Sequence, residues 1–214
     1  MTPNSPPNLA LRLFTTPDIL SNAPLNSSIT SLINEAFIDE ADRHSNIFPV
    51  GQPRLPERSS LAEMLGPHGV IATIIEEPDS TKSPDTETSW NVAACAAAIP
   101  WHGDLNGNGT DERGWEIKTV VVSHHPHKGY RKQGLAGRCA AALEEYLWQQ
   151  QELAERKAKL ELWVQVVFPN NVAYWGKRGY VELRRKTMPI GSFNSAKEWD
   201  LVIMKREVEI EYQG

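Results

Sequence analysis

Cysteines, long apolar runs and basic stretches are scarce in this sequence. These features are typical of secreted, membrane and nucleic-acid-binding proteins, respectively. Only two cysteines, Cys95 and Cys139, occur among 214 residues, and they form no CxxC pair, so a disulfide framework is not expected. The longest apolar run, at 92–99, is mostly alanine and too short to span a membrane. No basic segment precedes an apolar stretch at the N-terminus, so no secretory signal is predicted.

The charge balance also lacks a basic excess. With 22 basic and 27 acidic residues the net charge is −5, which argues against nucleic acid as a partner. Hydrophobic residues make up 40% and charged residues 23%, as in ordinary globular proteins. We therefore expect a protein of the cytoplasm, with the nucleus left open, that has no nucleic-acid or membrane partner and is a monomer or a homodimer.

Periodicity and turn residues predict one α/β domain. Residues 1–8 hold three prolines and two asparagines and are predicted to be a disordered tail, followed by a single domain over 9–214. Strands are predicted at 9–15, 70–75, 89–101, 115–122, 160–167, 180–186 and 199–208, and helices at 29–41, 58–65, 133–157 and 171–177. Ser27 or Ser28 is the expected N-cap of the first helix. This order predicts a mixed central sheet of six to seven strands flanked by about four helices.

The segment from Val120 to Gly137 is the most informative part of the chain. A valine-rich strand leads into a loop, and the loop opens a long helix whose first N–H groups have no partner within the helix. Arg131 and Lys132 add positive charge beside that turn. The small residues that would let an anion approach the amides are Gly134, Ala136 and Gly137. The segment therefore predicts a seat for a phosphate or pyrophosphate group.

Three phosphate-binding motifs compete for this segment. The glycines of a P-loop are matched at Gly129 and Gly134, but Leu135 and Ala136 replace the Lys-Ser/Thr pair that a P-loop requires. A GxGxxG dinucleotide motif is absent. The third pattern, Arg/Gln-x-x-Gly-x-Gly/Ala at the start of a helix, is satisfied by Arg131, Gly134 and Ala136.

In this context the string resembles the acyl-CoA-binding motif of the GNAT superfamily of N-acetyltransferases. A long amphipathic helix and an apolar strand follow it, and then the segment from Trp175 to Tyr180, which is similar to the family's Tyr/Trp-x-x-x-Gly-Phe/Tyr pattern. The resemblance covers residues 114–187, and before them only the order of elements agrees. It implies a single-domain GNAT fold in which the fourth and fifth strands splay apart, with acetyl-CoA as the acyl donor and no metal.

The resemblance also implies which residues would bind acetyl-CoA. Backbone groups of the valine strand would hydrogen-bond the pantetheine arm, one of them polarising the thioester carbonyl. The amides from Lys132 to Gly137 would bind the pyrophosphate, Asn170 or Asn171 would contact the pantetheine amides, and Trp175 would pack on the arm. The implied set is Val120, Val121, Val122, Arg131, Lys132, Gln133, Gly134, Leu135, Ala136, Gly137, Asn170, Asn171 and Trp175.

Glu116 is the candidate general base for the acceptor ammonium. It stands six residues before Val122, where the histone-acetyltransferase branch of the family has its glutamate. On an extended strand without a bulge, Glu116, Lys118, Val120 and Val122 would share one face. The alternative is a solvent-facing glutamate paired with Lys118 or Arg113.

The acid is where the sequence departs from the family's pattern. Trp175 occupies the position of the usual thiolate-protonating tyrosine, and an indole N–H is no acid near neutral pH. Tyr174, its neighbour, is the candidate substitute. The alternative is that water, or the acceptor's own proton, protonates the thiolate.

Other patterns suggest no further site. The run at 104–109 copies the opening of an EF-hand loop, but Trp115 replaces the required glutamate. The histidines at 124, 125 and 127 have no carboxylate or cysteine at ligand spacing, so we expect them at the CoA entrance and not on a metal. Cys139 is expected in the core.

Together these features predict transfer of an acetyl group from acetyl-CoA to a primary amine of a small molecule, by direct attack in a ternary complex. The acceptor site would be built by the first helices and the loops at 46–58 and 189–195. The alternatives are a non-catalytic acyl-CoA-binding sensor or scaffold, a protein N-acetyltransferase, and a transferase that uses a longer acyl-CoA.

Overall fold

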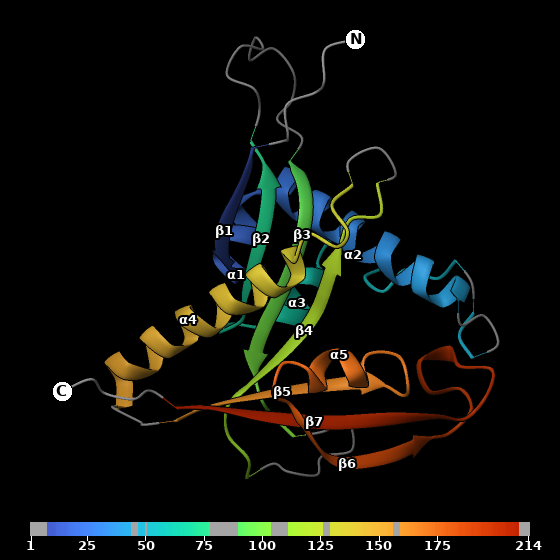
Figure 1. Cartoon of the computed structure of the whole chain (residues 1–214). Coiled ribbons are helices and arrows are strands. Elements are labelled where there is room, and N and C mark those ends of the chain that lie inside the picture. The colour runs from blue at the N-terminus through green and yellow to red at the C-terminus, as the bar shows by residue number, and fades with distance from the viewer. Residues whose placement is uncertain are drawn as a thin grey trace. The chain divides into compact units, whose positions relative to one another are not determined.

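A computed structural model gives the fold of the chain (Figure 1). It describes residues 8–43, 47–49, 51–77, 90–103, 111–125, 129–155 and 159–209. Most of the predicted tail, the EF-hand-like run at 104–109 and His127 lie outside the described residues. Asn8, the last residue of that tail, is described, and its side chain donates a 2.9 Å hydrogen bond to Glu77 Oε2.

The elements form an α/β fold with one mixed sheet. Its members are β1 (Leu9–Thr15), α1 (Thr16–Ser21), α2 (Ala23–Arg43), α3 (Ser60–Leu65), β2 (Val70–Glu76), β3 (Asn91–Pro100), β4 (Trp115–Val122), α4 (Leu135–Glu155), β5 (Lys159–Val167), α5 (Val172–Gly176), β6 (Val181–Met188), the short 3₁₀ helix η1 (Ser192–Asn194) and β7 (Trp199–Glu209). The sheet order is β1-β2-β3-β4-β5-β7-β6. The seven predicted strands are confirmed, whereas five α-helices replace the four expected among the described residues.

The start of the chain differs from the prediction because two helices share a junction. α1 was not predicted; it follows Thr15, whose backbone N–H donates to Asp18 Oδ2 at 2.8 Å, a local signal for a helix start. The next helix begins at Ala23, not at 29, and Asn22 Oδ1 accepts the N–H of Leu25 at 3.0 Å. Ser27 and Ser28 are therefore inside α2, and the prediction that one of them caps it is wrong. The proline of its first turn needs no N–H partner there.

The chain divides into two compact units, the first made of residues 1–37, 53–97 and 119–143. In unit 1, β1 and β2 pair antiparallel from Leu9↔Glu76 to Thr15↔Val70. Ala93 to Ala97 of β3 are fully buried, which explains the run of small residues there. Cys95 and Cys139 are free, buried thiols, and burial raises the pKa of Cys139 to about 12. The prediction that Cys139 is a core residue is confirmed.

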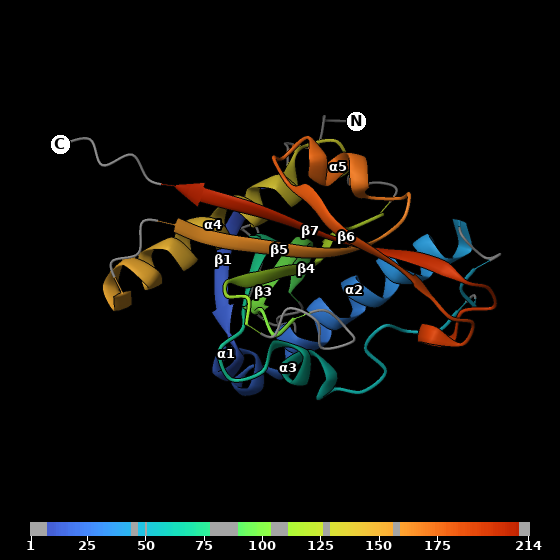
Figure 2. The same cartoon turned by 90° about the horizontal axis from the view of Figure 1, so that it is seen from below.

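Unit 2 contains residues 38–52, 98–118 and 144–214. β7 lies between β5 and β6 and pairs antiparallel with both (Figure 2). Along β5 the two faces differ. One face carries Leu160, Leu162, Val164 and Val166, which are all buried. The other carries Glu161, Gln165 and Val167, which are half-buried, and the buried Trp163. Because side chains of a strand alternate, this second group forms one face, and it carries the polar residues of the strand.

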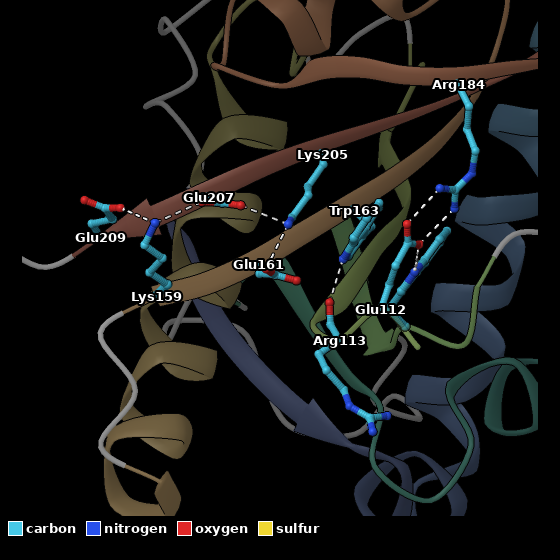
Figure 3. A network of polar contacts seen from close by, with 10 residues as sticks. Glu112, Arg113, Lys159, Glu161, Trp163, Arg184, Lys205, Glu207 and Glu209 are labelled. Carbon is cyan, nitrogen blue, oxygen red and sulfur yellow. Dashed lines mark hydrogen bonds and ion pairs between the residues drawn. The ribbon is translucent and has the colours of Figure 1, made fainter. Parts of the chain in front are cut away.

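Trp163, on that second face of β5, stacks on Trp101, and both indoles bind the residues that precede β4. The rings of Trp101 and Trp163 lie 4.8 Å apart at an interplanar angle of 2°. Arg184 makes a two-point ion pair with Glu112 at 2.8 and 2.9 Å (Figure 3). The Trp101 indole N–H donates to the same carboxylate at 2.9 Å, and that of Trp163 donates to the Arg113 carbonyl at 2.8 Å. These contacts thus hold Glu112 and Arg113, which lead into β4.

This network predicts a pH-dependent contribution to stability. The Arg184 hydrogen bonds, opposed by desolvation and aided by Trp101, lower the pKa of Glu112 from its ordinary value of 4.5. A lowered native pKa stabilises the fold above the ordinary value, and the gain is lost as pH falls through the native pKa. We expect Glu112→Gln to lower the free energy of unfolding by about 1.5–3 kcal/mol at pH 7. Urea unfolding of both proteins at neutral and acid pH measures this difference in the free energy of unfolding.

The loss should shrink as pH falls from 4.5 through the lowered native pKa, because the wild-type carboxyl is then protonated as well. Glu182→Gln is the control, since Glu182 forms an exposed ion pair with Arg185 at 2.9 Å and should contribute little. An equal loss at both pH values would contradict the ionic role of Glu112.

Candidate active site

The fourth and fifth strands of the sheet are paired only briefly. Their parallel pairing consists of Trp115↔Leu162 and Glu116↔Trp163, after which the strands separate as the predicted splay requires. Thr119, three residues further along β4, has a φ of 48°. A β-branched residue with positive φ is a genuine outlier, and it interrupts the extended geometry of the strand. The condition for placing Glu116, Val120 and Val122 on one face, an unbroken strand, is therefore not met.

Glu116 is buried, with 8% of its surface exposed. Its Oε2 lies 3.4 Å from Lys118 Nζ, and its Oε1 accepts a 3.3 Å hydrogen bond from Gln165 Nε2. The alternative of a solvent-facing glutamate is thus wrong about exposure, although the pairing with Lys118 is present. The carboxylate has one donor on each oxygen, an arrangement that orients it. Its role as a base stays a prediction.

Gln165 was not singled out from the sequence. It follows Glu161 and Trp163 on the second face of β5, and it brings a carboxamide to the Glu116 carboxylate. A polar residue within an otherwise apolar strand was the available signal. The periodicity of the sequence does not predict this contact, because the partner carboxylate lies 49 residues away in the sequence.

The two candidate aromatic residues lie side by side on α5. Trp175 is 5% exposed and contacts the rings of Tyr174 and Tyr180 edge-on, at centroid distances of 5.2 and 4.9 Å. The Arg178 guanidinium lies 3.6 Å from the centre of the Tyr174 ring. Trp175 is therefore a packing residue of unit 2, and contact with a pantetheine arm stays a prediction for it. The same holds for Tyr174 as the acid.

Asn170 and Asn171 differ in their surroundings. Asn170 Nδ2 donates to Glu40 Oε1, near the end of α2, at 3.3 Å. Asn171 is exposed and directly precedes α5, and its carbonyl accepts the N–H of Trp175 at 3.1 Å. Asn170 is thus tied to a helix, and Asn171 presents its side chain to solvent. Contact of Asn170 or Asn171 with the pantetheine amides stays a prediction.

The predicted phosphate seat lies in unit 1 and is open. Lys132 and Gly134 have φ values of 64° and 74°, whereas Gln133 between them does not, and such alternation turns successive N–H groups toward one concave side. α4 begins directly after, and the N–H of Arg138 bonds to the Gly134 carbonyl at 3.0 Å. A Cβ added to Gly134 would meet nothing within 4 Å. The turn thus leaves room for an anion at the helix start.

The other seat residues frame this turn. Arg131, Lys132 and Gln133 are exposed, and Gln133 Nε2 donates to the Gly129 carbonyl at 3.0 Å. Leu135 is buried in the core, and Ala136 and Gly137 are partly buried. Val121 is buried, and Val120 and Val122 are half-buried. The geometry fits a pyrophosphate bound through backbone amides; binding itself stays a prediction.

Two loops expected to line the acceptor site meet in unit 2. The Ala196 N–H donates to the Ile47 carbonyl at 2.7 Å, and Asn194 Nδ2 donates to Gln52 Oε1 at 2.8 Å. The Phe48 ring contacts Trp199 edge-on at a centroid distance of 5.4 Å. These loops therefore form one connected surface, whose use as an acceptor site stays a prediction.

The parts of the chain that the structure describes contain neither a cluster of metal ligands nor a helix that could span a membrane. His124 and His125 are exposed on the loop after β4, and no group of three or more metal-ligating side chains occurs among the described residues. Within the same residues, every helix is too short or too polar to cross a bilayer.

Solved structures share this fold, although sequence comparison finds no relative. No protein-family model matches the chain, and no curated protein sequence is significantly similar to it. The ribosomal-protein-S18-alanine N-acetyltransferase of Escherichia coli superposes with a TM-score of 0.52 at 15% identity, covering 97% of this chain and 98% of that chain. An acetyltransferase of the GNAT family from Streptococcus pneumoniae gives 0.51 at 13% identity, covering 94% and 99%.

A third structure, Arabidopsis thaliana NAA60 in complex with a bisubstrate analogue, has a TM-score of 0.52 at 14% identity and covers 94% of this chain and 100% of that chain. These identities are low, so the likeness concerns the fold. It agrees with the strand order, the brief parallel pairing of β4 with β5 and the helix that follows β4. The chain therefore has the fold of the GNAT acyl-CoA N-acyltransferases.

Proposed function

We propose that this protein transfers the acetyl group of acetyl-CoA to a primary amine of a small-molecule acceptor, by direct attack in a ternary complex. The observation that carries the proposal is a buried carboxylate, Glu116, held by donors on both oxygens where β4 leaves β5. A buried carboxylate at this strand end of a GNAT fold supports the assignment of a base for an ammonium substrate.

Acetyl-CoA would supply the acetyl group in activated form, as a thioester. The backbone N–H groups from Lys132 to Gly137 bind its pyrophosphate at the start of α4, and backbone groups of Val120 to Val122 hydrogen-bond the pantetheine arm. Arg131 and Lys132 contribute positive charge at that turn. These roles need amides, small residues and charge, which is what the open turn around Gly134 offers.

Proton transfer is assigned to residues of unit 2. Glu116 takes a proton from the acceptor ammonium, directly or through a water molecule, and so generates the amine that attacks the thioester carbonyl. One backbone N–H of the valine strand polarises that carbonyl. Tyr174 is the proposed donor of a proton to the departing thiolate, with water as the alternative. No step requires a metal.

Release of free CoA tests the proposal. The protein is incubated with acetyl-CoA and, separately, spermidine, tyramine or a short peptide that begins with alanine, between about pH 7 and 9. Amine-dependent CoA release, with the acetylated amine identified by mass spectrometry, is the expected result. Preference for the peptide would favour a protein acetyltransferase instead. Binding of acetyl-CoA without release with any amine would favour a sensor.

A further inference from the structure

Three side chains of unit 2 share one face where the β4–β5 pairing ends. Glu116 is the direct partner of Trp163 across the parallel pair, and Gln165 follows two residues later on β5. Paired residues of neighbouring strands point to the same side, and so do residues two apart. Gln165 is in turn the register partner of Ile203 on β7, a buried apolar residue.

The hydrogen bond to Glu116 fixes the orientation of the Gln165 carboxamide. Its Nε2 lies 3.3 Å from Glu116 Oε1. The flipped amide would place two oxygens against each other, so the NH₂ group faces the carboxylate and Oε1 takes no part in this hydrogen bond. That oxygen has less than 1 Å² of exposed surface and accepts no hydrogen bond from any part of the chain that the structure describes.

A buried carbonyl oxygen without a donor is unfavourable, and native proteins rarely leave one unexplained. The missing partner is an N–H or O–H donor that the described residues do not supply. The other oxygen of the carboxylate that Gln165 contacts, Glu116 Oε2, has Lys118 Nζ at 3.4 Å, and the Lys118 side chain is 22% exposed, so it has a path to solvent. Two oxygens, Gln165 Oε1 of β5 without a donor and Glu116 Oε2 of β4 held by an exchangeable ammonium, thus occur where the β4–β5 pairing ends, and both can accept hydrogen bonds from a primary ammonium group.

We infer that Gln165 is a second acceptor-binding residue. The ammonium of the acceptor donates one hydrogen bond to Gln165 Oε1 and another to Glu116 Oε2, where it takes the place of Lys118 Nζ. Through Nε2, Gln165 also holds the base in the orientation that receives the proton. This inference rests on the proposed function and goes beyond it by naming the pair of oxygens that recognises the amine.

Two substitutions distinguish the role of the Gln165 carbonyl oxygen, which would bind the amine, from that of its NH₂ group, which donates to Glu116. Gln165→Met keeps a side chain of similar length but removes both groups, whereas Gln165→Glu keeps an oxygen and loses the donor to Glu116. We expect Gln165→Met to raise KM for the amine about tenfold, which corresponds to the loss of about 1.4 kcal/mol of binding. For Gln165→Glu, kcat should fall because the base is disturbed, while KM for the amine stays within about threefold of wild type.

The kinetics use spermidine, tyramine or the alanine-initiated peptide, whichever the wild-type protein acetylates fastest. KM for acetyl-CoA should remain unchanged in both variants. Gln149→Met, on the exposed side of α4, is the control and should alter none of these constants. Gln165→Glu tests the oxygen independently should Gln165→Met fail to fold.

An unchanged KM for the amine in Gln165→Met would overturn the inference and assign Gln165 to packing alone. A KM in Gln165→Glu as high as in Gln165→Met would do the same. These failures differ from failure of the proposed function, which would appear as no acetylation by the wild-type protein with any of the three amines.

Discussion

Replacing Glu116 with glutamine is expected to lower kcat by about 100-fold or more at pH 7. The carboxamide is close in size to the carboxylate, but it cannot accept the proton of the acceptor ammonium. An alkylammonium has a pKa of about 10, so the free-amine fraction in solution rises about tenfold with each pH unit. The deficit should therefore shrink above about pH 8, because less of the amine then needs a base. The measurement is kcat across this pH range.

Glu161→Gln provides the control. Glu161 lies on the same face of β5, and its partner is Lys205 at 2.8 Å, so its loss removes a carboxylate without touching the Glu116 site (Figure 3). Its pH–rate profile should match that of the wild-type protein. If Glu116→Gln lowers kcat by the same factor at every pH, Glu116 is not the base and serves only the packing of β4 against β5.

A negative charge at Gly134 is expected to weaken acetyl-CoA binding about tenfold or more, relative to a neutral side chain of the same shape. Gly134 has a φ of 74°, which aspartate and asparagine tolerate better than other residues, and a Cβ there meets nothing within 4 Å. Two unit charges 4 Å apart repel by about 1 kcal/mol in water and about 4 kcal/mol near a protein surface. Calorimetric titration of Gly134→Asp and Gly134→Asn with acetyl-CoA measures the difference.

Unfolding would not explain such a result. Aspartate and asparagine have the same shape and would adopt the same positive φ, so any backbone strain is equal in the two variants and cancels from their comparison. The difference should also narrow at high salt, because screening weakens the repulsion. Equal affinities of the two variants at low salt would place the pyrophosphate away from this turn.

The sequence predicts the strands of this fold well, because alternation and buried apolar runs are local signals. β1 and β4 have the predicted limits, 9–15 and 115–122. α1 was missed although Thr15 and Asp18 carried a local signal, since a six-residue helix buries too few residues to show periodicity. With the cap at Asn22, α2 begins at Ala23 and not at residue 29 as predicted.

The site was predictable only where local signals define it. The turn around Gly134 could be recognised because glycine, small residues and basic residues follow one another in the chain. The positive φ of Thr119 could not, since threonine has no preference for that conformation. The contact of Asn170 with Glu40 joins residues 130 apart, and that of Gln165 with Glu116 joins residues 49 apart. Such pairs follow from tertiary packing, which one sequence does not reveal.

Thermal unfolding with acetyl-CoA tests the central claim most directly, because the proposed chemistry requires that this donor bind. At a ligand concentration about 100-fold above Kd, the native state gains about 2.7 kcal/mol. For a chain of 214 residues this should raise Tm by about 5–10 °C. ATP and NAD, which carry phosphates without the pantetheine arm, should give a much smaller rise. No rise with millimolar acetyl-CoA would contradict the assignment of an acyl-CoA site, and the proposed transferase activity with it.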